Sequence, residues 1–179
     1  MSVLAGERPG SGEYDPFYET YVGRIGAGPV LSILSAQVEA LRELISSLVP
    51  GGEDYRYAAG KWSVLDILGH LNDSERIFGM RATCIARGET QDLPGFEQDD
   101  YVAAGNFDQR QVDSMIREFE SLRAANVEML SSLVLKDWDR RGRANGSPIT
   151  VRAIGWILAG HVDHHLAVLS ERYGQAFSS

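Results

Sequence analysis

The sequence predicts an all-α protein, a four-helix bundle with a short N-terminal arm and two long connecting loops. Four segments of roughly 20 residues carry apolar side chains at steps of three and four, and no alternating segment indicates a parallel sheet. Residues 14–179 are therefore expected to form one domain. At its start, aromatic residues within 14–25 are expected to lie on the core in a short turn or helix. Residues 1–13, rich in Gly, Ser and Pro, are expected to form a disordered arm.

The first two helices have boundary signals in the sequence. The first is expected to begin near Pro29, because proline suits the first turn of a helix, and to end at the Pro-Gly-Gly sequence at 50–52. The second is expected to begin at Ser63, with Asp66 three residues later in a capping-box arrangement. It should end near Gly88, a residue type that favours helix termination.

The other two helices follow the same logic. Asp108 is the expected cap of the third helix, and Thr150 is the expected cap of the fourth, which should end near Tyr173. An Asn-Gly turn signal within 143–147 is compatible with a small hairpin before the fourth helix.

The two long connections cover residues 89–107 and 134–149. Both exceed the roughly 12–15 residues beyond which structureless loops are uncommon, and such loops are often binding loops or lids. In the first, Leu93, Phe96 and Tyr101 either anchor a lid over a site or plug the end of the bundle. The sequence favours neither alternative.

Composition excludes several classes of protein. With 17 Lys and Arg against 25 Asp and Glu, the net charge is −8, which repels phosphate backbones, so no nucleic-acid partner is expected. No apolar segment reaches the roughly 18 residues of a membrane span, and the N-terminus does not resemble a signal peptide. The single cysteine suits a reducing compartment, so a cytoplasmic location is expected.

The histidines are the strongest chemical signal. His161, His164 and His165 lie within five residues of the fourth helix, and the one remaining histidine is His70. At 100° per residue, His161 and His165 lie one turn apart in the centre of the apolar stripe, whereas His164 lies at its edge. His70 is midway along the second helix, on the flank of its stripe. Since that point can face the fourth helix in a bundle, we expect His70, His161 and His165 to converge.

A divalent metal explains this pattern, because imidazoles at i and i+4 can reach one ion. Three histidine ligands leave positions open for water or substrate, as in catalytic sites, and zinc or nickel suits an all-imidazole shell, with iron or manganese also compatible. The alternative is a set of core histidines that bond to backbone carbonyls or to each other.

Glu75 is the candidate catalytic residue. It falls in the apolar stripe of the second helix, where a buried carboxylate can orient a ligand or transfer a proton. A helix-packing salt bridge with an arginine such as Arg76 or Arg81 explains the same position equally well.

The chain resembles the DinB/YfiT-like superfamily of metal-binding four-helix bundles from about residue 14 to residue 173. The segments that carry the resemblance are YAAGKWS at 57–63, GHLNDSER at 69–76, RGE at 87–89, LPGFEQD at 93–99 and GHVDHH at 160–165. The resemblance implies a mononuclear site, with zinc or nickel held by His70, His161 and His165, and a homodimer.

Relatives in that superfamily include hydrolases, S-transferases that use low-molecular-weight thiols, and a maleylpyruvate isomerase. The resemblance therefore implies a metal-dependent hydrolase or thiol-dependent S-transferase that acts on a small molecule. Two alternatives are a non-catalytic bundle that binds metal or a small ligand, and a metal-free dimerisation bundle with hydrogen-bonded histidines.

Overall fold

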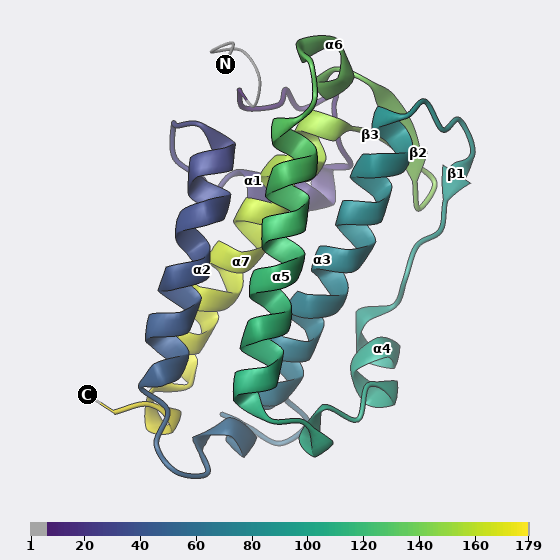
Figure 1. The fold of residues 1–179 in the computed structure, drawn as a ribbon. Coiled ribbons are helices and arrows are strands. Elements are labelled where there is room, and N and C mark those ends of the chain that lie inside the picture. Colours follow the sequence, from purple (N-terminus) through teal and green to yellow (C-terminus); the bar gives the residue numbers. More distant parts are fainter. Residues whose placement is uncertain (1–6, 179) are drawn as a thin grey trace.

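The computed structural model describes residues 7–178, and within them four long helices pack into a bundle (Figure 1). These are α2 (Val30–Ser46), α3 (Val64–Ala86), α5 (Val112–Ser131) and α7 (Val151–Arg172). Helices α2 and α3 each pack against both α5 and α7. The predicted four-helix bundle is confirmed.

The direction of the helices explains the long first connection. Helices α3 and α5 run the same way along the bundle, so the chain must return along its full length between them (Figure 1). That return contains β1 (Asp92–Leu93), α4 (Gln98–Ala104) and the 3₁₀ turn Phe107–Gln109. Its length therefore follows from topology, and the segment is structured where the sequence suggested a loop.

Local caps agree with the sequence at three of the four helix starts. Ser63 and Asp66 form the capping box of α3, and the Thr150 hydroxyl accepts a hydrogen bond from the backbone of Ala153. Pro29 directly precedes α2. The expected cap at Asp108 is wrong, because that residue lies in the preceding 3₁₀ turn and Gln111 occupies the cap position of α5.

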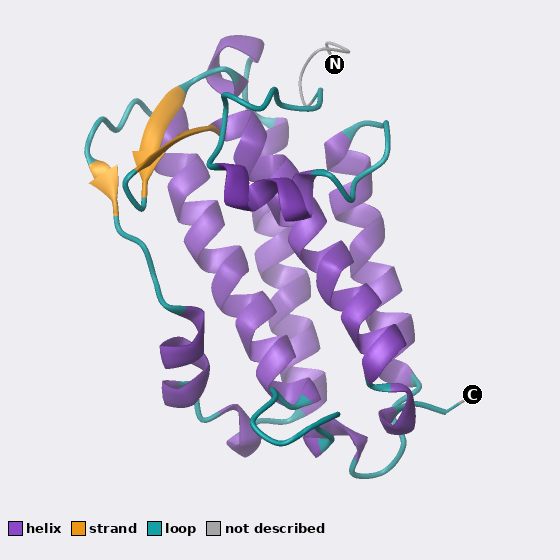
Figure 2. Cartoon of the chain, turned by 180° about the vertical axis from the view of Figure 1, so that it is seen from behind, coloured by secondary structure: helices purple, strands orange, loops and turns teal. Residues whose placement is uncertain are grey.

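A small three-stranded sheet closes one end of the bundle, near the start of α7 (Figure 2). Strands β2 (Arg141–Ala144) and β3 (Ser147–Thr150) form the expected hairpin, with Asn145 and Gly146 at positive φ in its turn. Strand β1 adds in parallel to β2, a pairing that no segment of the sequence had indicated. Because β1 has only two residues, it leaves no periodic pattern in the sequence.

The shorter elements lie at the ends of the bundle and along its side. The 3₁₀ turn Pro16–Tyr18 leads into α1 (Glu19–Val22), which packs against α7, and α6 (Leu135–Trp138) precedes the hairpin. Two further 3₁₀ turns, Gly52–Asp54 and Gly174–Ala176, lie together at the opposite end.

The N-terminal arm is partly fixed. Residues 1–6 of the expected disordered arm lie outside the described residues. In the rest, the Glu13 carbonyl accepts a hydrogen bond from the backbone of Thr150, and its carboxylate binds Thr150 and Arg152. Glu13 therefore attaches the end of this arm to the start of α7, and the disorder expected for residues 1–13 stays a prediction.

The core consists of two apolar clusters with polar side chains between them. One cluster surrounds Trp138 and Trp156 near the sheet, and the other surrounds Phe119 and Tyr173 near the opposite end. Buried polar residues lie at the level between them: Gln37, His70, Asn72, Ser74, Glu75, Arg123, His161 and His165. Among the described residues, no helix is long and apolar enough to cross a membrane.

Candidate metal centre

Helices α3 and α7 bring three histidines together in the middle of the bundle. His70 comes from α3, and His161 and His165 come from successive turns of α7; their exposed fractions are 3%, 4% and 7%. The three ring centroids lie 4.7–5.0 Å apart. One nitrogen from each ring lies within 4.8 Å of the others, which places three neutral donors around one point.

Hydrogen bonding leaves this cluster incompletely satisfied. The Nε2 atoms of His70 and His161 lie 2.8 Å apart, so one donates to the other. The buried Nδ1 atom of His165 has no hydrogen-bond partner among the described residues. The metal-free alternative, in which core histidines bond to each other, therefore explains only two of the three rings. The third ring keeps a buried nitrogen without a hydrogen bond, which is energetically costly.

The donor set fits a metal ion. Tetrahedral coordination places imidazole nitrogens about 3.3 Å apart, a separation that lies between the 2.8 Å of the His70–His161 pair and the 4.8 Å limit of the cluster. Burial lowers the pKa of His70 to about 4 and lowers the pKa values of His161 and His165 well below 6.5. The imidazoles are therefore neutral at pH 7, the form that binds metals.

Aromatic side chains surround the cluster. The Trp62 ring lies 4.9 Å from the His70 ring and stacks 6.5 Å from the His165 ring. The Tyr21 ring meets His161 edge-on at 5.3 Å. These contacts fix the imidazole planes and lower the local dielectric constant, which strengthens interactions with a bound cation.

His164 lies outside the cluster. Its ring is half-buried and packs edge-on against Tyr21 at 5.6 Å and against His165 at 5.0 Å, but its nitrogens are not among the three that converge. The neighbouring Asp163 faces outward and pairs with Arg24. The edge position expected from the helical angles is what the structure shows.

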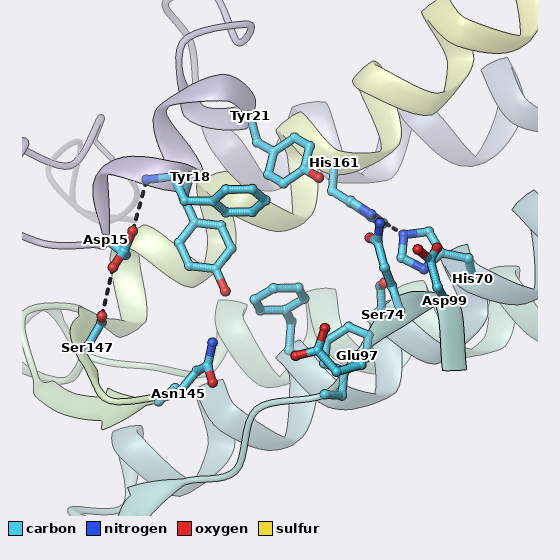
Figure 3. A pocket seen from close by; sticks show the side chains of 15 residues that line it. Asp15, Tyr18, Tyr21, His70, Ser74, Glu97, Asp99, Asn145, Ser147 and His161 are labelled. Atoms are coloured by element: carbon cyan, nitrogen blue, oxygen red, sulfur yellow. Dashed lines mark hydrogen bonds between the residues drawn. The ribbon is translucent and has the colours of Figure 1, made fainter. Parts of the chain in front are cut away.

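Two pockets adjoin the histidines. One, of about 440 Å³, reaches His70 and His161, and is shown in Figure 3. The other, of about 370 Å³, reaches His165. Tyr21, Gln98 and Asp99 border both pockets, so an ion held by the histidines would be accessible from either side.

Residues of the connection at 89–107 line the larger pocket and also pack against the core. Phe96 and the residues that follow it, up to Asp99, line the larger pocket, whereas Phe107 is buried beneath α3. Leu93 packs against the core, but Tyr101 is 47% exposed and does not fill the end of the bundle. Leu93 therefore fits the plug alternative and Phe96 borders the site, whereas a lid function of the segment stays a prediction.

Glu75 forms a buried ion pair with Arg123 of α5. The Oε1 atom of Glu75 lies 2.6 Å from Nη2 of Arg123, its Oε2 atom accepts from Arg123 Nε at 3.1 Å, and Asn126 Nδ2 donates to Oε2 at 2.9 Å. Both side chains of the pair are fully buried. The alternative of a helix-packing salt bridge thus holds, but both suggested partners were wrong: Arg76 pairs with Glu118, and Arg81 bonds to Pro94.

Sequence reasoning missed Arg123 and several wall residues of the site. Arg123 follows Phe119 by four residues and precedes Leu130 by seven, so its place on the apolar stripe of α5 was a usable signal. Tyr18, Tyr21 and Asn145 come from a 3₁₀ turn, a single-turn helix and a hairpin turn, which are too short for a periodic pattern to predict which side chains face a pocket.

The fold and the histidine cluster together define a helical bundle with a candidate metal centre at mid-depth. The family model of the DinB superfamily matches residues 33–169, and the chain belongs to this superfamily. The chain is also similar to the solved structure of YfiT from Bacillus subtilis, with a TM-score of 0.73 and 17% identity over 97% of this chain and 98% of that one. YfiT is described as a probable metal-dependent hydrolase with an unusual four-helix bundle topology. Among curated proteins, none matches this chain.

Proposed function

We propose that this protein is a metal-dependent hydrolase of small molecules. His70, His161 and His165 hold a divalent cation, with zinc or nickel favoured by three imidazole donors. The observation that carries the proposal is the convergence of these buried neutral rings, one with an unpartnered nitrogen, beside pockets large enough for a substrate. A bound cation of this kind acidifies a coordinated water and polarises an electrophile.

The surrounding residues determine what else the site does. Trp62 and Tyr21 keep the imidazoles in place and exclude bulk water from their faces. Glu75 positions α3 against α5 through Arg123 and takes no part in proton transfer, because its oxygens are already bound. Asp99 is the carboxylate available to accept a proton, since it borders both pockets and has no hydrogen-bond or ion-pair partner among the described residues.

Reconstitution of activity tests the proposal. Metal-stripped protein is loaded with Zn²⁺ or Ni²⁺ and assayed on a panel of small esters and amides, with and without a low-molecular-weight thiol as the nucleophile. We expect metal-dependent turnover that is lost in Asp99→Asn and retained in Asp100→Asn, because Asp100 borders neither pocket. Turnover only with the thiol would assign an S-transferase, and no metal-dependent turnover on the panel would favour the non-catalytic binding alternative.

A further inference from the structure

Arg81 on α3 is a buried cation without a carboxylate partner. Its side chain is 1% exposed, its Nη2 donates to the Pro94 carbonyl at 2.6 Å, and its Nε has no partner among the described residues. The guanidinium lies over the rings of Phe78 and Phe96, at 5.2 and 5.9 Å, and it forms no ion pair within the described chain. Unlike Arg123, which is neutralised by Glu75, Arg81 carries an uncompensated charge, and such burial is unfavourable.

Tyr18 connects this charge to the larger pocket. Its ring packs edge-on against Phe78 at 6.0 Å, and the Arg81 guanidinium lies over that same Phe78 ring, so the buried charge lies close to the Tyr18 phenol. Figure 3 shows this hydroxyl pointing into the pocket, toward the Asn145 amide. Burial raises the pKa of Tyr18, so the hydroxyl keeps its proton at neutral pH and acts as a donor.

Asn145 supplies a second donor at the same place. It occupies the turn of the β2–β3 hairpin with φ of 52°, and its backbone nitrogen donates to the Leu93 carbonyl at 2.9 Å. Its amide also packs closely on Gly95, where a side chain would collide with it. The hairpin and the return segment therefore fix the backbone of Asn145 at the pocket wall and limit where its amide can lie.

We propose that Tyr18 and Asn145 form a subsite for the carboxylate of a substrate, with Arg81 as the neighbouring buried cation that supplies positive charge. The aromatic rings of Phe78 and Phe96 line the same pocket as this subsite and His70. The substrate class is accordingly a small carboxylate with a flat apolar body. The assignment rests on the proposed function only in one respect, which is that the bound carboxylate is taken to react at the histidines. Binding of a carboxylate at the subsite itself requires no turnover.

The acidic residues of the pocket do not cancel this preference. Asp15 accepts hydrogen bonds from Ser147 at 2.7 Å and from the backbone of Phe17 at 2.9 Å, and the dipoles of these donors partly offset its charge. Glu97 and Asp99 are exposed, so solvent and salt screen their charges. Arg81 is buried, and its field in the pocket is screened much less.

Three probes of the same shape and different charge test the proposal directly. Benzoate, benzamide and benzamidine carry charges of −1, 0 and +1, and their binding is measured by titration calorimetry on both metal-free and zinc-loaded protein. We expect benzoate to bind at least about tenfold more tightly than benzamide, also without metal, because a charge-assisted hydrogen bond accounts for that difference. A preference for benzamidine, equal binding of benzoate and benzamide, or no binding of any probe would overturn the proposal.

Variants separate the subsite from general stability. Arg81→Met should lower benzoate affinity about tenfold and leave benzamide affinity within about twofold, and Arg81→Lys should restore part of the preference. Arg76→Met, on the same helix but at an exposed arginine that pairs with Glu118, is the matched control. Should Arg81→Met fail to fold, Tyr18→Phe provides the same contrast against Tyr14→Phe, whose hydroxyl bonds to Glu19 instead.

The two proposals fail in different ways. A charge preference that survives in metal-free protein while no metal binds would retain the subsite and remove the proposed metal-dependent function. Metal-dependent turnover with no charge preference, or with a preference unchanged by Arg81→Met and Tyr18→Phe, would retain the function and remove the subsite.

Discussion

Replacement of Glu75 by glutamine tests whether this buried carboxylate is a structural element. The substitution keeps the shape of the side chain but leaves Arg123, which is fully buried, without a counter-ion. Breaking a buried pair by neutralising one partner costs about 3–5 kcal/mol, and the glutamine oxygen still accepts one hydrogen bond, so the lower end applies. At about 2 kcal/mol per molar urea, the unfolding midpoint should fall by roughly 1.5 M, and Tm by roughly 10 °C.

The control for this substitution is Glu120→Gln. Glu120 on α5 pairs with Arg42 of α2 at 2.5 Å, which is as short as the buried pair, but Arg42 is half exposed. Exposed pairs contribute about 0–1 kcal/mol, so this variant should unfold close to the wild type. Equal losses for the two variants, or a Glu75→Gln protein of unchanged stability that has lost turnover, would refute the structural role and restore Glu75 as a catalytic candidate.

Two further predictions concern pH and packing. Burial lowers the pKa of His70 from 6.5 to about 4, so between these pH values the unfolded chain binds a proton that the folded chain does not. The contribution of neutral His70 to the stability of the metal-free protein is therefore complete above pH 6.5. It should be lost as the pH falls toward 4, at a cost of about 3 kcal/mol in the free energy of unfolding. Urea unfolding between pH 4 and 8 measures this, and a flat profile would contradict it. Gly160→Ala should cost about 1–3 kcal/mol, because its new methyl group meets the Tyr21 carbonyl, whereas Gly174→Ala enters open space and should change stability little. Comparable urea midpoints for the two glycine variants would show that α1 does not pack closely on α7.

The bundle was predictable because each long helix repeats its signal many times. The apolar stripes and the caps at Ser63 and Thr150 are local features, and they remain visible without knowledge of the partners they pack against. Strand β1 and helix α4 are different, because their positions depend on the parallel run of α3 and α5, which no local pattern encodes. The incorrect cap at Asp108 has the same origin, since the return segment ends in a 3₁₀ turn.

The histidine cluster was predictable for a similar reason. Helical angles place His161 and His165 on one face, and with a single histidine left elsewhere in the chain, His70 was the natural third member. The partner of Glu75 required knowledge of which face of α5 meets α3, and so Arg123 was missed. Residues of the pocket wall, such as Tyr18 and Asn145, are brought into place by irregular segments, and only the structure shows them.

The central claim, that three imidazoles hold one divalent ion, is tested most directly by titrating Zn²⁺ and Ni²⁺ into metal-stripped protein by calorimetry. The cluster geometry predicts one ion per chain for the wild type, loss of binding in His161→Ala, and near-normal binding in His164→Ala, because His164 lies outside the cluster. Well under one ion per chain in the wild type, or equal loss from both substitutions, would contradict the claim.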